Sequence, residues 1–182
     1  KEEIIHWSYE LLTKTYGFNS DDLYVSVFEG DKKDKLSKDN EAYDMWSKIV
    51  PNEKIILGGK KDNFWEMGDT GPCGPCSEIH IDLRSDSEKS KIPGKDLVNM
   101  DHPNVIELWN LVFIQFNRKS NGELVELPQK HIDTGMGFER LVRVIQKKES
   151  NYDTDIFSPL IKTIESLSNK KYGSNLKADV AM

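Results

Sequence analysis

The chain has 182 residues, of which 37% are hydrophobic and 31% are charged, the ordinary composition of a soluble protein with one good core. Its 25 basic and 31 acidic residues give a net charge of −6, so no overall basic field marks it as a nucleic-acid binder. The longest apolar stretch, 105–116, is interrupted by Glu107, Asn110 and Gln115 and cannot span a bilayer. We expect no signal peptide and no membrane segment, and a reduced, cytoplasmic protein.

The first third of the chain alternates between helical and extended patterns. Periodicity and turn residues predict, in chain order, a helix over 2–16 that Gly17 ends, a strand over 23–28, a loop over 29–40, a short helix capped by Ser37 and stopped by Pro51, and a brief strand over 55–57.

The pattern changes at Asn63. The run GDTGPCGPC, residues 68–76, holds three glycines and two prolines and predicts a rigid loop. It leads into a strand over 77–83 with strict alternation of apolar and polar residues. The polar segment 84–104 predicts a mobile surface insertion.

The remaining strands and helices follow from a second set of signals. A strand over 107–117, a turn at Asn121-Gly122 and a return strand over 123–127 predict a hairpin. A glycine-led helix over 135–146 comes next, and a helix over 158–167 begins a further helical unit. Antiparallel strands with helices gathered on one side, and no βαβ rhythm, predict an α+β fold.

The block HIDTGMGFERL, residues 131–141, has the sharpest chemistry. Glycines at 135 and 137 let a ligand approach the backbone closely. Asp133 suits a cationic amine, and Arg140 can fork onto phosphate oxygens. A structural alternative is equally compatible with the sequence: Asp133 caps a helix, and Arg140 pairs with a carboxylate.

Two other blocks hold weaker candidates. Glu107 and Asn110 are three residues apart, so a regular strand would aim them at opposite faces, and a bulge is needed to bring both oxygens to one ion. Trp65 either walls a pocket or packs beside Phe64. The polar residues of strand 77–83 are either catalytic or a solvated face, and composition favours the solvated face; they are Glu78, His80 and Asp82.

Cys73 and Cys76 form a lone CxxC. No second pair of cysteines or histidines stands at zinc-ligand spacing, so a structural zinc site would be half built. We therefore expect no zinc in this segment, and a small zinc module is the least favoured interpretation of the chain.

Taken together, the motifs resemble those of the alanyl-tRNA synthetase family. GMGFER, residues 135–140, is similar to motif 3 of class II aminoacyl-tRNA synthetases, and WEMGDTGPCGPCSEI with DTGMGFER is similar to signatures of the alanine-specific members. The similarity covers residue 1 to about 155, and the tail resembles the start of a helical tRNA-binding region.

The resemblance implies a class II antiparallel sheet flanked by helices, which activates alanine with ATP and transfers it to tRNA(Ala). It implies these site residues: Asp133 and Asn110 for the ammonium of alanine; Trp65, Val112 and Gly135 for a methyl-sized pocket; Arg140, as the catalytic residue, and Gly137 for ATP; and Glu107 with Asn110 for Mg²⁺.

Motifs 1 and 2 of the class and the editing domain are not in the chain. We therefore expect a fold that is incomplete: the second half of an aminoacylation domain over 1–150 and the start of a helical domain over 151–182. Such a piece, separated from the remainder of the polypeptide, is expected to be inactive. The alternative function is that of a non-catalytic relative that keeps the fold and binds tRNA or protein.

Overall fold

The computed structural model describes residues 1–174. The chain divides between Gly137 and Phe138 into two compact units, and each is described by itself. The boundary expected at residue 150 separates a catalytic region from a tRNA-binding region. It is a functional boundary, different from this structural one, and it stays a prediction. No helix within residues 1–174 combines the length and the apolar character that crossing a membrane requires.

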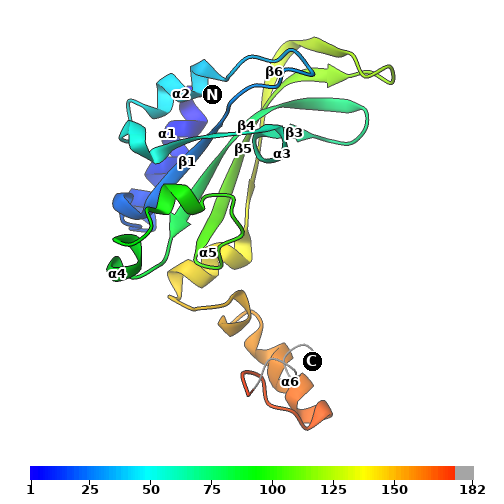
Figure 1. Cartoon of the computed structure of the whole chain (residues 1–182). Helices are drawn as coiled ribbons and strands as arrows, with labels where there is room; N and C mark the ends of the chain where they lie inside the picture. The colour runs from blue at the N-terminus through cyan, green and yellow to red at the C-terminus, as the bar shows by residue number, and fades with distance from the viewer. Residues whose placement is uncertain (175–182) are drawn as a thin grey trace. The chain divides into compact units, whose positions relative to one another are not determined.

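The first unit is built on a six-stranded sheet with the order β2-β1-β4-β5-β6, in which β3 also pairs with β4 (Figure 1). The strands are β1 Leu23–Phe28, β2 Ile55–Gly58, β3 Phe64–Glu66, β4 Gly71–Asp82, β5 Val105–Arg118 and β6 Leu124–Met136. Every pair is antiparallel except β1 and β2, which run parallel. The α+β prediction is confirmed, with one parallel pair that it did not include. That pair arises because α2 carries the chain back before β2 begins.

Helices cover one face of this sheet. They are α1 Glu2–Glu10, which continues as the π-helical turn η1 Leu11–Thr15, and α2 Asn40–Trp46. The indole Nε1 of Trp46 donates to Ser77 Oγ of β4 at 2.8 Å, and Trp46 is fully buried. The cap of α2 is Asp39, which accepts from the backbone N–H of Ala42 at 3.1 Å, and the prediction of Ser37 is wrong. Asp39 immediately precedes the first helical residue, where a capping side chain must stand.

The glycine- and proline-rich run 68–76 is a loop only over 68–70, and the loop predicted for 71–76 is wrong because these residues form a strand. Residues from Gly71 onward lie in β4 between β3 and β5, and a register shift between Cys73 and Cys76 absorbs the irregularity. Gly74 is required by packing, because a Cβ there would lie 2.0 Å from the carbonyl oxygen of Phe113. Prolines are tolerated in strands beside such irregularities.

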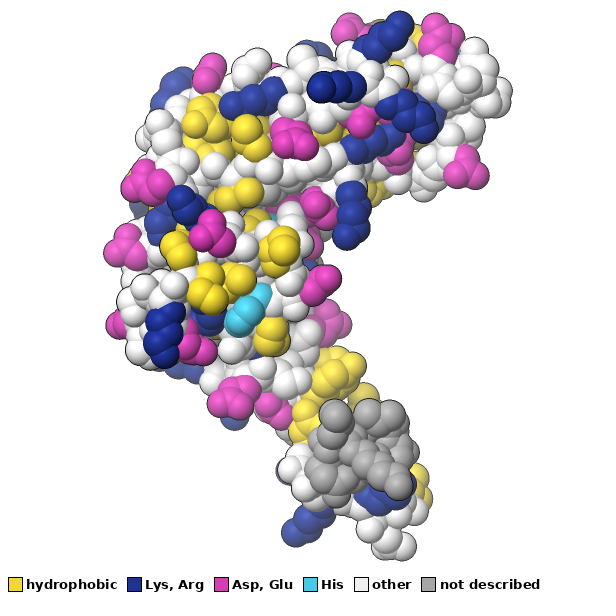
Figure 2. All heavy atoms as spheres, viewed as in Figure 1, with side chains coloured by type: hydrophobic (Ala, Val, Ile, Leu, Met, Phe, Trp, Pro, Cys, Tyr) yellow, Lys and Arg dark blue, Asp and Glu magenta, His cyan; other side chains and the backbone are white. Residues whose placement is uncertain are grey.

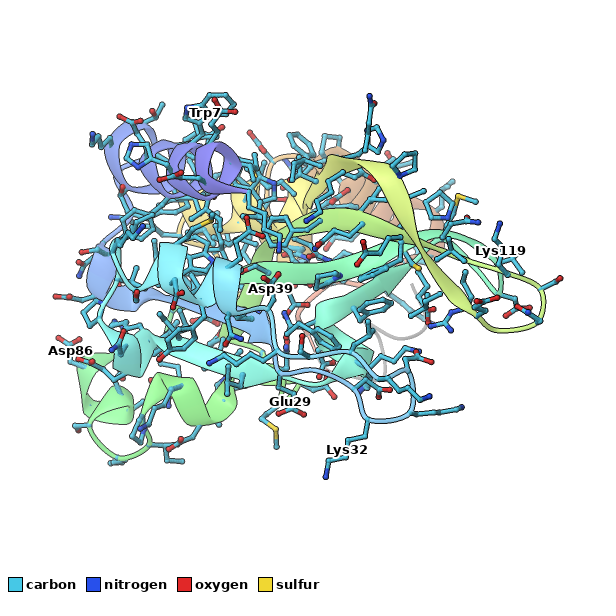
Figure 3. The ribbon with its side chains drawn as sticks, turned by 90° about the horizontal axis from the view of Figure 1, so that it is seen from above. Trp7, Glu29, Lys32, Asp39, Asp86 and Lys119 are labelled. Carbon is cyan, nitrogen blue, oxygen red and sulfur yellow. The ribbon has the colours of Figure 1, made fainter. Side chains whose placement is uncertain are left out.

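The segment 84–104 is a structured layer on the other face of the sheet. It contains α4 Asp86–Lys89 and the 3-10 turn η4 Gly94–Leu97, and Val98 is buried. Trp7 of α1 and Asp86 of α4 lie on opposite sides of the sheet (Figures 1 and 3). Figure 2 shows hydrophobic side chains between charged ones over this region. The segment predicted as a mobile surface insertion therefore contains short helical elements, and its mobility stays a prediction.

Short elements connect these parts. They are η2 Ser20–Asp22, η3 Asn52–Lys54 and α3 Lys60–Asn63 in the first unit, and α5 Phe138–Ile145, η5 Asn151–Asp153 and α6 Ser158–Ser168 in the second. The hairpin turn at Asn121-Gly122 is confirmed, with Gly122 at a φ of +85°. The return strand is longer than predicted, so 131–136 is extended and the predicted helix begins only at Phe138. Residues 175–182 of the predicted helical region lie outside the described part.

Candidate functional site

Strand pairing brings together four of the residues expected to bind alanine. In the register of β5 and β6, Asn110 stands opposite Gly135 and Val112 stands opposite Asp133. Directly paired residues lie side by side on one face of a sheet, with Cβ atoms about 4.5–5.5 Å apart. The two motifs, separated in sequence, therefore form one patch on the face opposite α1 and α2.

A bulge adds Glu107 to the same face. Ile79 of β4 pairs with Trp109, whereas His80 pairs with Glu107, so Leu108 has no partner. The extra residue cancels the odd spacing, and the side chains of Glu107 and Asn110 both emerge on the face that carries Glu78 and His80. This is the bulge that the spacing of Glu107 and Asn110 required.

Asn110 holds an unsatisfied acceptor. Its Oδ1 is buried and has no hydrogen-bond partner within residues 1–174. An unpaired buried polar atom costs about 1–3 kcal/mol, so the position suits a ligand that donates a hydrogen bond or carries positive charge. With the carboxylate of Glu107 on the same face, the donor set consists of hard oxygen atoms, which fit Mg²⁺.

Gly135 and Asp133 border open space. A Cβ at Gly135 would meet nothing within 4 Å, so packing within the described chain does not require glycine there. Asp133 is exposed, and its Oδ1 accepts from the backbone N–H of Thr134 at 2.8 Å. It lies within β6, well before α5 begins, so the alternative in which it caps that helix is wrong.

The other expected residues lie further along the chain or the sheet. Trp65 is in β3, opposite Gly74, and its backbone is hydrogen-bonded to the thiol of Cys76, the β4 residue that pairs with Val112. Gly137 ends the first unit and donates its N–H to Leu108 O at 2.9 Å. Arg140 is an exposed residue of the first turn of α5, in the second unit.

Both cysteines are buried thiols with separate surroundings. Cys73 packs in a cluster with Phe28 and Phe64. Cys76 donates to Asp62 O at 3.6 Å, and burial, followed by the charge of Glu78, raises its pKa to about 12. Residues 1–174 contain no group of three or more acidic, histidine or cysteine side chains arranged to hold a metal ion.

We expect the chain to bind no stoichiometric zinc, because thiols that stay protonated and face different neighbours do not make a tetrahedral site. Elemental analysis of chelator-washed protein measures this directly. One zinc per chain, lost on replacing Cys73 and Cys76 with serine, would contradict the expectation.

The polar residues of β4 are buried, and the prediction of a solvated face is wrong. Glu78, His80 and Asp82 are only 6%, 1% and 1% exposed. Oε2 of Glu78 accepts from Ser26 Oγ at 2.9 Å, from Asn99 Nδ2 at 2.8 Å and from His80 Nε2 at 3.1 Å. Sequence alternation found the shared face but carried no signal for Ser26 or Asn99, since nothing local shows that 84–104 folds over it.

Comparison with known proteins places these features in a family. The sequence profile described as "tRNA synthetases class II (A)" matches residues 1–182. Proteins named alanine–tRNA ligase from Christiangramia forsetii, Cytophaga hutchinsonii and Flavobacterium psychrophilum are 63%, 61% and 58% identical to the chain, covering 100%, 100% and 96% of it. The chain spans 21%, 21% and 20% of those relatives, about a fifth of their length.

Proposed function

The chain belongs to the family of class II (A) tRNA synthetases, and on this basis we propose that it is part of an alanine–tRNA ligase. The observation that carries the proposal is the strand register that sets Asn110, Val112, Asp133 and Gly135 on one face, with an unpaired oxygen of Asn110 among them. An acceptor and a carboxylate beside open backbone suit the ammonium group of a small amino acid.

In the proposed reaction, a carboxylate oxygen of alanine attacks the α-phosphorus of ATP. Alanyl-adenylate forms and pyrophosphate leaves. The 3′-terminal ribose of tRNA(Ala) then attacks the alanyl carbonyl and AMP leaves. No protein nucleophile is needed, because the carboxylate of alanine and a ribose hydroxyl of the tRNA are themselves the nucleophiles, and catalysis depends on positioning and charge neutralisation. The protonated, buried thiols of Cys73 and Cys76 are consistent with a structural role.

The residues divide the work between the two substrates. Asp133 and Asn110 hold the ammonium of alanine, while Val112, Gly135 and Trp65 bound the space for its methyl group. Arg140 and the backbone at Gly137 bind ATP phosphates, and Arg140 stabilises charge on them. Glu107 and Asn110 would hold Mg²⁺, which would supply positive charge to neutralise the triphosphate. Asn110 can contact both the ammonium of alanine and Mg²⁺, because its amide oxygen has two lone pairs.

We propose that this activity takes place in the cytoplasm and does not involve a membrane. Its partners are ATP, alanine, tRNA(Ala) and the remainder of the polypeptide. The test is alanine-dependent ATP–pyrophosphate exchange by the full-length protein that carries these residues. Exchange that requires alanine supports the ligase. A full-length protein that binds tRNA without any exchange would establish the non-catalytic relative instead.

The 182-residue chain by itself should not form alanyl-adenylate. The arginine of motif 2 expected on the α-phosphate is not among its residues, and removing one such preorganised group costs about 10²–10³ in rate. Exchange rates of the purified chain and the full-length protein, at equal concentration, measure the difference. Rates within tenfold of each other would contradict the proposal that part of the ATP site lies in the full-length protein outside these 182 residues.

Serine and glycine should be activated at rates within about 10²–10³ of alanine, because an apolar pocket discriminates weakly against a missing methyl or an added hydroxyl. Exchange measured with each amino acid tests this, with valine as the bulky control that the pocket excludes by collision. An otherwise intact ligase without its editing domain should accumulate seryl-tRNA. Rejection of serine by more than about 10⁵ would require a polar group facing the hydroxyl and would overturn the apolar pocket.

A further inference from the structure

A buried carboxylate that the proposed reaction does not use lies beside the proposed Mg²⁺ ligands. In the β4–β5 ladder, Glu78 stands directly opposite Asn110, and His80 stands directly opposite Glu107. Side chains at such paired positions are immediate neighbours on one face. Glu78 and His80 therefore lie next to the two oxygen donors on the same face of the sheet. They belong to β4, which flanks β5 on the side away from β6.

Three segments hold Glu78 in one place. The donors to its Oε2 come from Ser26 of β1, His80 of β4 and Asn99 of the segment 84–104. Because an ionised carboxylate only accepts hydrogen bonds, Nε2 of His80 carries its proton toward Glu78. Nδ1 of His80 is then a buried atom with no hydrogen-bond partner within residues 1–174. None of the hydrogen bonds in this described part reaches Oε1 of Glu78.

The charge of Glu78 acts at Asn110. Three donors converge on Oε2 of Glu78, an arrangement that favours the ionised carboxylate over the neutral acid. Asn110 stands directly opposite Glu78 in the β4–β5 ladder, and Glu107 stands opposite His80, the next residue on that face of β4. The carboxylates of Glu78 and Glu107 therefore lie on the same face of the sheet as Asn110.

We propose that Glu78 is a positioning residue for the divalent cation: its fixed buried charge, directly opposite Asn110, raises the affinity of the Glu107–Asn110 oxygen pair for the ion. The inference rests on the proposed function. Groups of this kind, one layer behind metal ligands, typically contribute about 10–100-fold to metal affinity.

The experiment measures Mn²⁺ binding by electron paramagnetic resonance in the full-length ligase with ATP present, and the Mg²⁺ concentration that half-saturates pyrophosphate exchange. Glu78→Gln removes the charge and keeps the shape, so both values should rise about 10–100-fold. Glu78→Asp restores the charge and should recover part of the affinity. The matched control is Ser77→Ala, which loses the bond from Trp46 on the opposite face. It should lower the melting temperature without changing either metal value.

Unchanged Mn²⁺ affinity in a folded Glu78→Gln protein would overturn the inference. If that variant does not fold, Asn99→Ala replaces it: removing one anchor should weaken Mn²⁺ binding at least threefold, and an unchanged affinity would equally overturn the inference. Further measurements distinguish a failure of the role of Glu78 from a failure of the proposed function, and the first uses the variant Glu107→Gln. Loss of Mn²⁺ binding in Glu107→Gln but not in Glu78→Gln defeats only the role of Glu78, whereas a wild-type protein without alanine-dependent exchange defeats the proposed function.

Discussion

Replacing Asp133 with asparagine is expected to lower kcat/KM for alanine in the full-length ligase by roughly 10²–10⁴-fold. Asp133 is exposed in this chain, and alanine binding, with the remainder of the site, is what would enclose its charge. Removing one partner of an enclosed charge pair costs about 3–5 kcal/mol, because the ammonium is then left without a counter-charge. Alanine-dependent pyrophosphate exchange over a range of alanine concentrations measures the loss.

The control for this substitution is Glu126→Gln on the same strand. Glu126 is an exposed carboxylate that pairs with Phe116, away from the patch. Removing its charge should leave exchange unchanged. Near wild-type exchange by Asp133→Asn would remove Asp133 from the alanine site and leave the unpaired oxygen of Asn110 as the remaining candidate for the ammonium.

Replacing Arg84 with alanine is expected to lower the free energy of unfolding by about 3–5 kcal/mol, the cost of leaving a buried charge without its partner. Nη2 of Arg84 donates to Asp82 Oδ2 at 2.7 Å, and the two side chains are 3% and 0% exposed. Arg84 also donates to the carbonyl oxygen of Ile92 at 2.9 Å, which ties the segment 84–104 to β4. Urea denaturation followed by circular dichroism measures the difference.

Lys89→Ala is the matched control, because it breaks a contact with Asp22 whose side chains are 24% and 28% exposed. Pairs of that kind contribute about 0.2–1 kcal/mol. A loss of less than about 1 kcal/mol for Arg84→Ala would show that the buried pair does not anchor the segment.

The effect of Arg84→Ala should also depend on pH. Burial would raise the pKa of Asp82, but hydrogen bonds from Arg84 outweigh it, so the folded-state value lies below the ordinary 3.8. The stability from this carboxylate is therefore complete above pH 3.8 and is lost as pH falls through the lower, folded-state value. Unfolding curves of the wild type and Arg84→Ala should converge in that acidic range. A difference that persists below it would mean that Arg84 acts through packing.

Local pattern was sufficient for several of the elements, and it supplied the candidate site residues, whose roles stay predictions. The alternation in 23–28 and the Asn121-Gly122 turn predicted a strand and a hairpin that the structure contains, because side-chain period and turn chemistry are properties of short segments. The motifs around 65–79 and 133–140 indicated the family before any geometry was known. The spacing of Glu107 and Asn110 indicated that the two residues could share an ion only if a bulge lay between them. It could not indicate whether that bulge exists.

The tertiary structure decided which strand residues pair and which segment covers each face of the sheet. Leu108 is the bulge residue only because β4 sets the register on both sides of it, and the Gly-Pro run is extended because β3 and β5 supply hydrogen bonds that outweigh its preference for turns. Glu78 and His80 alternate like a solvated face, yet Asn99 and its segment cover them. Alternation within a strand reports which residues share a face; what lies over that face depends on contacts between residues far apart in the chain.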